Sequence, residues 1–117
     1  MTSAAEMAGV LRGFVDQFNR VPELPRMAAG WNRSILVQAA DAGWVHGLRV
    51  EGGRVSLSAV TPATAQITLH GPADTLAAIF RGELSPTEPY LDGTLVVRSS
   101  EEDMLKLDVF TLMVWGE

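Results

Sequence analysis

The sequence offers few side chains that could do chemistry, and its two histidines come first. His46 alternates with Trp44 and Leu48, so it could orient the polar head of a ligand or act as a general base. The plainer interpretation is a histidine at a strand edge, bonded to water or to a carbonyl. His70 lies at the end of a polar strand face and needs no role. Two histidines this far apart, in a chain without cysteine, favour neither a metal site nor thiolate catalysis.

Carboxylates and hydroxyls elsewhere form no recognisable catalytic arrangement. Glu101, Glu102 and Asp103 are consecutive and could hold a cation, but the positive end of a helix attracts the same residues without an ion. Ser56 and Ser58 have no base and acid at a spacing that would activate them. We therefore predict no catalytic residue, no metal and no cofactor.

Composition and charge restrict the class of protein. The chain has 117 residues, of which 47% are hydrophobic, so we expect one globular domain over residues 1–117. The net charge is −5 and Lys106 is the sole lysine, which argues against nucleic acid as a partner. No apolar run approaches the ~20 residues of a membrane-spanning helix, and the N-terminus lacks the pattern of a secretory signal. We expect a cytoplasmic protein without stable membrane insertion.

Hydrophobic periodicity predicts three longer helices. Ser3 and Glu6 have capping-box spacing, and the apolar residues that follow recur every three or four positions, which predicts a helix over residues 3–20. Two prolines then limit the chain to a short turn or a separate helical piece. The other two helices are predicted over residues 73–81 and 101–115. A second capping box, of Ser99 and Glu102, would open the last one.

Alternating apolar residues and turn signals predict five strands. Their ranges are 32–40, 44–50, 55–60, 65–70 and 94–99. The first three form an antiparallel meander, because short turns rich in glycine connect them. One polar and one apolar face indicate helices on one side only. The predicted fold class is α/β of the α+β type: a five-stranded, mostly antiparallel mixed sheet covered by helices on one face.

The second half of the chain carries a series of glycine, leucine and proline motifs at regular spacing. They are Gly82-Glu83-Leu84-Ser85-Pro86, then Gly93-Thr94-Leu95, then Met104-Leu105-Lys106-Leu107. This order of strand, helix, connector, strand and closing helix resembles the sterol carrier protein-2 family. The segment GWVHGLRVEGGRVSL is similar to the tryptophan-bearing meander of that family, so the resemblance covers roughly residues 30–112.

The resemblance implies a hydrophobic tunnel between the sheet and the helices. Such a tunnel would bind or carry a fatty acid or other lipid, as expected of a bacterial lipid-transport protein, and the connector 83–92 and the last helix would form part of its wall. Tyr90 could close the tunnel with an apolar ring and a polar tip. The predicted ligand-binding residues are Trp44, His46, Phe80, Leu84, Tyr90, Leu95, Met104, Leu107, Phe110 and Met113.

Two questions stay open at this point. The last helix is apolar nearly all round, so it could cover a ligand, pack across the core or form a homodimer with its copy. The pocket could also serve a small enzyme, a cyclase or isomerase with His46 as base. A third alternative is a noncatalytic accessory module that presents lipid-like intermediates to partner enzymes.

Overall fold

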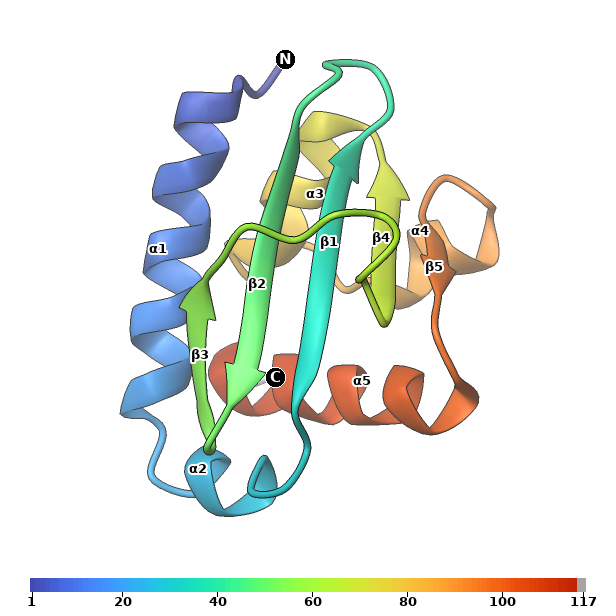
Figure 1. The fold of residues 1–117 in the computed structure, drawn as a ribbon. Helices are drawn as coiled ribbons and strands as arrows, with labels where there is room; N and C mark the ends of the chain where they lie inside the picture. Colours follow the sequence, from blue (N-terminus) through green and yellow to red (C-terminus); the bar gives the residue numbers. More distant parts are fainter. Residues whose placement is uncertain (116–117) are drawn as a thin grey trace.

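A five-stranded mixed sheet forms the centre of the computed structural model, which describes residues 1–115 (Figure 1). The strands are β1 (Arg33–Ala39), β2 (Val45–Glu51), β3 (Arg54–Leu57), β4 (Ile67–Gly71) and β5 (Val96–Arg98). Their order in space is β3-β2-β1-β4-β5. β1 and β4 run parallel, whereas the other neighbouring pairs are antiparallel. The predicted meander and the mixed, mostly antiparallel sheet are confirmed.

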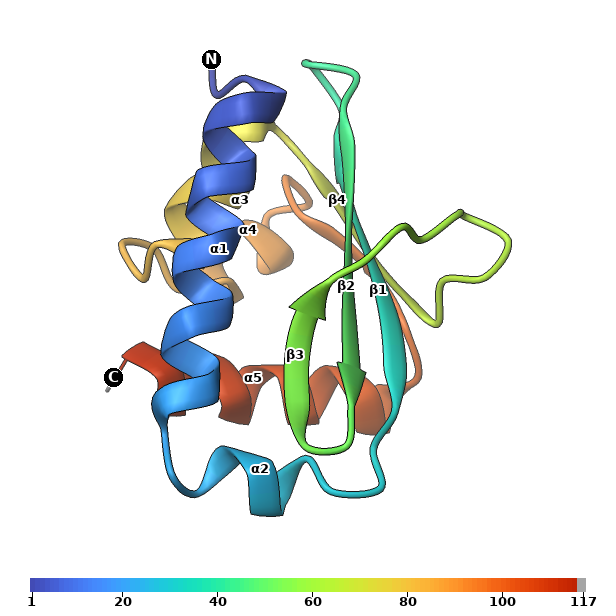
Figure 2. The same ribbon diagram turned by 60° about the vertical axis from the view of Figure 1, so that its left-hand side comes forward.

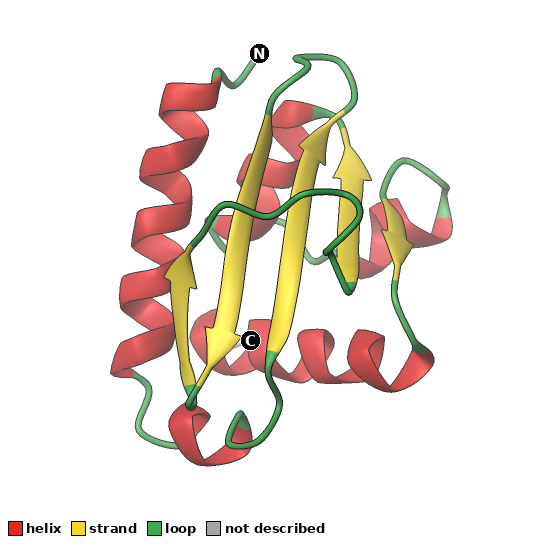
Figure 3. Cartoon of the chain, viewed as in Figure 1, coloured by secondary structure: helices red, strands yellow, loops and turns green. Residues whose placement is uncertain are grey.

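The helices gather on one face of this sheet. They are α1 (Ala4–Arg20), α2 (Leu24–Met27), α3 (Ala73–Phe80), α4 (Thr87–Leu91) and α5 (Glu101–Trp115), shown in red in Figure 3. In Figure 2 the sheet is seen nearly edge-on, with α1, α3, α4 and α5 on one side and the chain between β3 and β4 on the other. Within α5, the side chains of residues 111, 112, 114 and 115 lie outside the described part.

The chain between β3 and β4 crosses the open face because β2 leaves room for it. Ser58 N donates to Gly47 O at 3.0 Å, and a Cβ on Gly47 would overlap Ser58 O and the side chain of Val60. Only glycine fits there. The crossing delivers β4 alongside β1, where Ile67 pairs with Ile35 in the parallel direction.

α1 is capped at its start and bonded to the sheet near its end. The Ser3–Glu6 capping box is confirmed, with Glu6 N donating to Ser3 Oγ at 3.1 Å and Ser3 N to Glu6 Oε1 at 3.0 Å. At the other end, the amide side chain of Asn19 exchanges two hydrogen bonds of 3.0 Å with the backbone N and O of Val55. Asn19 therefore occupies backbone groups on β3, the edge strand that would otherwise pair with another chain.

Three strands lose two or three predicted residues at one end. β3 ends at Leu57 instead of residue 60, where the chain begins its crossing. β4 begins at residue 67 instead of 65, because Ala65 N donates to Thr61 O in a turn. β5 begins at residue 96 instead of 94, because Leu95 N donates to Pro89 O. The bounds of β1 and β2 agree with the prediction to within one residue.

The first turn of α5 is anchored by a buried carboxylate. The predicted cap at Ser99 is wrong by one residue, because Ser100 Oγ is the atom that accepts from Asp103 N, at 3.1 Å. Asp103, which is 5% exposed, accepts from Trp31 Nε1 at 2.8 Å and from Arg33 Nε at 2.9 Å. Burial opposes the charged form of Asp103, but the hydrogen bonds from Arg33 and Trp31 and the Arg33 charge outweigh it, so the pKa of Asp103 lies below its ordinary value of 3.8. This contact joins α5 to the start of β1.

We predict that Asp103→Asn lowers the free energy of unfolding by about 1–3 kcal/mol, because it removes a charged acceptor from two buried or half-buried donors. Urea unfolding at neutral pH measures the change. The matched control is Glu102→Gln on the exposed side of the same turn, which should stay within about 0.5 kcal/mol of the native protein.

The contribution of Asp103 also has a defined pH dependence. Its folded-state pKa is lowered, so the stabilisation is present above the ordinary aspartate range and is lost as the pH falls through the lower folded-state value. The stability difference between native protein and Asp103→Asn should therefore shrink in acid. An unchanged difference at low pH would show that the charge of Asp103 contributes nothing.

Candidate ligand-binding site

A cavity of about 320 Å³ lies between the covered face of the sheet and the helices. The sheet supplies its roof, α1 and α3 supply one wall, and α4 and α5 supply the other. Its lining residues are Phe14, Phe18, Trp31, Ile35, Leu48, Val50, Val55, Leu69, Leu76, Ile79, Phe80, Pro86, Thr87, Tyr90, Leu91, Leu95, Val97, Met104, Leu105, Leu107, Asp108 and Phe110.

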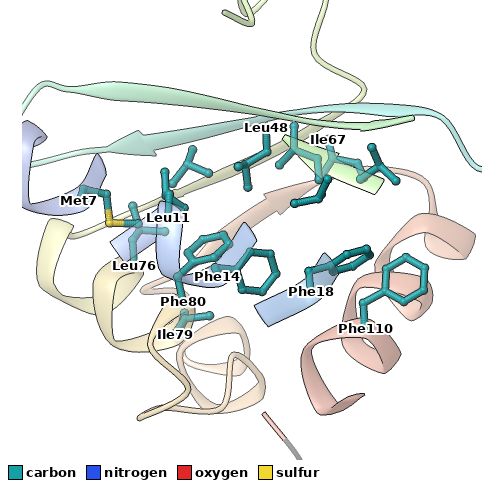
Figure 4. Packing of buried hydrophobic residues seen from close by; sticks show 14 of the residues in the cluster. Met7, Leu11, Phe14, Phe18, Leu48, Ile67, Leu76, Ile79, Phe80 and Phe110 are labelled. Carbon is teal, nitrogen blue, oxygen red and sulfur yellow. The ribbon is translucent and has the colours of Figure 1, made fainter. Parts of the chain in front are cut away.

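Five aromatic rings form a continuous arc along this lining. Phe80 meets Phe14 edge-to-face with ring centroids 5.0 Å apart, and Phe14 lies 6.2 Å from Phe18. Phe18 meets Phe110 at 5.5 Å, and Phe110 meets Trp31 at 5.3 Å. Figure 4 shows Phe14 beside Phe80, and Phe18 facing Phe110. Rings packed edge-to-face attract one another beyond their burial. Phe80, Phe14 and Phe18 therefore form a stiff wall on α3 and α1, and Phe110 of α5 packs against Phe18 of that wall and against Trp31.

The lining is almost wholly apolar, which determines what can occupy the cavity. Among the lining residues that the structure describes, only Thr87, Tyr90 and Asp108 bring a polar side-chain group other than the Trp31 indole N–H, which is already bonded to Asp103. Water inside would find few partners. An empty hollow of 320 Å³ would cost about 8 kcal/mol at ~24 cal/mol per Å³, comparable with the whole stability of a small domain. An apolar guest is the occupant that removes this cost.

The mouth of the cavity lies between α4 and α5. Exposed residues from both helices reach the lining there, namely Tyr90 and Leu91 from α4 and Leu105 from α5. The chain after α4 is held by Asp92, whose Oδ1 accepts from Thr94 N at 2.8 Å. Hydrogen bonds from the side chain and backbone N–H of Thr94 lower the pKa of Asp92.

The structure brings six of the ten predicted ligand-binding residues together. Those that line the cavity are Phe80, Tyr90, Leu95, Met104, Leu107 and Phe110. Leu84 and Met113 are half-buried and pack against the core outside the lining. A contact between any of these residues and a ligand stays a prediction.

Trp44 and His46 lie outside the cavity lining, beside the N-terminal segment. Trp44 Nε1 donates to Thr2 O at 3.0 Å, and His46 Nε2 lies 2.9 Å from Ala4 O. A carbonyl can only accept, so Nε2 is the donor in this contact. The two rings lie 5.2 Å apart and help to seat the start of α1. Their alternation with Leu48 correctly predicted that both residues lie on the covered face of the sheet. The N-terminal segment, and not the cavity, lies against them there.

The sequence-based site missed the residues that α1 and the sheet contribute. Phe14 and Phe18 recur at helical spacing, and Ile35, Leu69 and Val97 belong to strand patterns, so each was assigned to an apolar face without a cavity. The sequence offered no signal for these residues. The structure shows that Leu69 and Val97, which pair across β4 and β5, are only half-buried.

Among residues 1–115, no group of three or more histidine, aspartate or glutamate side chains is placed to hold a metal ion. None of the described helices is long and apolar enough to cross a membrane.

Sequence comparisons and structural comparisons give different results. No family model matches the sequence, and no curated protein matches it. The first solved structures that match belong to the sec-alkylsulfatase Pisa1 from Pseudomonas sp., with a TM-score of 0.58, 19% identity and 76% of this chain covered. This chain spans only 14% of that structure's length.

Several matches of similar length have sterol carrier protein 2 or SCP2 in their names. The UbiJ-SCP2 ubiquinone synthesis protein has a TM-score of 0.69 and 16% identity over 92% of this chain and 93% of its own. Sterol carrier protein 2 from Yarrowia lipolytica has a TM-score of 0.61 and 14% identity over 97% of this chain and 93% of its own. Palmitated SCP2L2 from Aedes aegypti has a TM-score of 0.61 and 13% identity over 87% and 90%. The chain therefore has the sterol carrier protein 2 fold that its motifs predicted.

Proposed function

We propose that this protein binds and carries a lipid, such as a fatty acid, in the cavity between its sheet and helices. The observation that carries the proposal is the apolar lining of a 320 Å³ cavity with an open mouth. Each methylene that a guest buries contributes ~0.8 kcal/mol, so an acyl chain suits the site. The solved structure of palmitated SCP2L2 supports the proposal by likeness of fold.

A second candidate is a module that presents lipid-like intermediates to partner enzymes. It is favoured by the likeness to the UbiJ-SCP2 ubiquinone synthesis protein, which matches nearly end to end. Both candidate functions need the same cavity. They differ in the molecule that receives the ligand. The alternative of a small enzyme would use His46 as the general base in the pocket. The His46 ring lies outside the cavity lining. A homodimer through α5 stays a prediction.

We predict that long-chain fatty acids raise the melting temperature. At a ligand concentration of ~100 times the dissociation constant, binding adds ~2.7 kcal/mol, which corresponds to a rise on the order of 10 °C for a domain of this size. Thermal scans with dodecanoic to octadecanoic acid measure it, and butanoic acid, with the same head group, is the control. If no chain length raises the melting temperature above butanoic acid, the carrier proposal fails.

We predict that Val97→Phe weakens lipid binding about tenfold or more without lowering the stability of the empty protein. Val97 is half-buried and faces the cavity, so the added ring takes space that a guest would use and does not overpack a filled core. Fluorescence titration with a fatty acid measures affinity, and urea unfolding measures stability.

The neighbouring residue gives the matched control. Val96 lies on the same strand but faces the open side of the sheet, where it is 42% exposed. Val96→Phe should leave lipid affinity unchanged. Equal losses in the two variants would mean that the site lies elsewhere.

We predict that α5 is the wall that opens. Its first turn is anchored at Asp103, and Phe110 is packed, but Leu105 and Val109 face solvent. Hydrogen exchange should show amides 104–114 exchanging faster than those of β1 without ligand, and slowing when a fatty acid is added. Equal protection with and without ligand would make α5 a fixed wall and direct the search to residues 83–92.

A further inference from the structure

The mouth of the cavity carries an exposed apolar surface formed by α4 and α5. We define the mouth patch as Tyr90, Leu91, Leu105 and Val109, which are 42, 77, 64 and 42% exposed. Tyr90, Leu91 and Leu105 line one cavity, and Val109 follows Leu105 by one helical turn, so the four residues lie on the two helices that border the mouth. An exposed apolar patch beside a cavity marks a surface that another molecule covers.

Acidic side chains surround this patch. We define the acidic rim as Glu88, Asp92, Glu101, Glu102 and Asp108, of which the first two flank Leu91 in sequence and the others lie within four residues of Leu105 on α5. Among residues 1–115, no rim carboxylate forms an ion pair.

The basic residue closest in sequence to the patch does not neutralise the rim. Lys106 follows Leu105, but its ammonium lies over the Trp31 ring, 6.0 Å from the centroid. The contact draws the charge of Lys106 toward the anchored side of α5, where Asp103 also lies. The mouth is therefore apolar at its centre and negative at its edge.

We propose that the mouth patch docks a basic amphipathic helix of a partner protein. The apolar face of that helix would cover Leu91 and Leu105, and its lysines or arginines would meet the rim, which is the usual arrangement of a helix bound in an apolar groove. The inference rests on the proposed lipid-carrying function, because the docked surface is the route by which lipid leaves the cavity. A partner seated there shields the moving lipid from water.

Charge selects this occupant over a membrane surface. Cytoplasmic lipid leaflets carry negative charge, and the rim would be repelled by them within a Debye length of ~8 Å at physiological salt. A basic helix gains from the same field. The net charge of −5 adds to the long-range attraction.

The test uses the full chain and a designed probe. The probe is a helical peptide of about 18 residues with leucines on one face and lysines on the other, and the comparison peptide has glutamates in place of the lysines. Fluorescence anisotropy should show that the lysine peptide binds, that the glutamate peptide does not, and that added salt weakens binding. Equal binding of the two peptides would overturn the proposal.

Matched charge variants locate the surface. Glu88→Gln with Glu101→Gln removes two rim charges and should weaken lysine-peptide binding about threefold or more. Asp16→Asn with Glu23→Gln removes two charges far from the mouth in sequence, from exposed positions in and just after α1, and should have no effect. Equal weakening by both pairs would mean attraction to overall charge alone and would overturn the proposal.

Matched apolar variants and vesicles complete the test. Leu91→Ser should weaken peptide binding, whereas Val45→Ser, at a position 53% exposed on β2, should not. Vesicles of phosphatidylglycerol and phosphatidylcholine in equal parts should bind the protein no better than phosphatidylcholine alone. Tighter binding to the anionic vesicles would assign the patch to membranes and overturn the proposal.

Failure of docking is distinguishable from failure of lipid binding. Glu88 and Glu101 do not line the cavity, so fatty acids should stabilise the Glu88→Gln, Glu101→Gln variant as they do the native protein. If fatty acids stabilise neither protein, the carrier proposal is wrong. If they stabilise both and the rim variant binds the lysine peptide as tightly as the native protein, only the docking proposal is wrong.

Discussion

The apolar hollow under the sheet is the constraint on which the rest of the structure depends. An unfilled space of 320 Å³ costs about 8 kcal/mol, so the surrounding elements must be held apart by contacts that do not need the hollow to be filled. Each wall has such a contact at its end. Asn19 joins α1 to β3, Asp103 joins α5 to the start of β1, and Thr2 bonds to Asp74 at the start of α3. These polar contacts hold the helices against the sheet, and the apolar side chains inside line the space that a guest would fill.

The two sides of the cavity differ in stiffness, and we expect them to play different parts in ligand binding. The rings of Phe80, Phe14 and Phe18 on α3 and α1 are buried and packed ring against ring. The mouth side is made of a five-residue helix, α4, and the exposed flank of α5. A ligand bound as proposed would rest against a fixed wall and pass through an adaptable one, so we expect its affinity and its rate of exchange to depend on different residues.

Local patterns predicted the sheet, its meander and the single covered face, because alternation and turn residues report burial directly. They could not locate the cavity. Phe14 and Phe18 have the same helical spacing whether they pack against a neighbour or border a hollow. Asp103 stands in a row of three acids, and only the tertiary position of Trp31 and Arg33 distinguishes it from the other two. Trp44 and His46 were placed on the correct face, but the N-terminal segment that covers them is remote in sequence.

The parallel pairing of β1 with β4 also sets an order of assembly. The meander closes through short local turns, whereas β4 reaches β1 only after the chain has crossed the open face at Gly47. Pairing between distant segments is slower, since loop entropy is lost before native contacts form. The segments α3, α4, β5 and α5 all follow β4 in the chain. A chain leaving the ribosome can therefore complete its meander before the lipid-sized hollow exists, so the surface that attracts apolar molecules is built last.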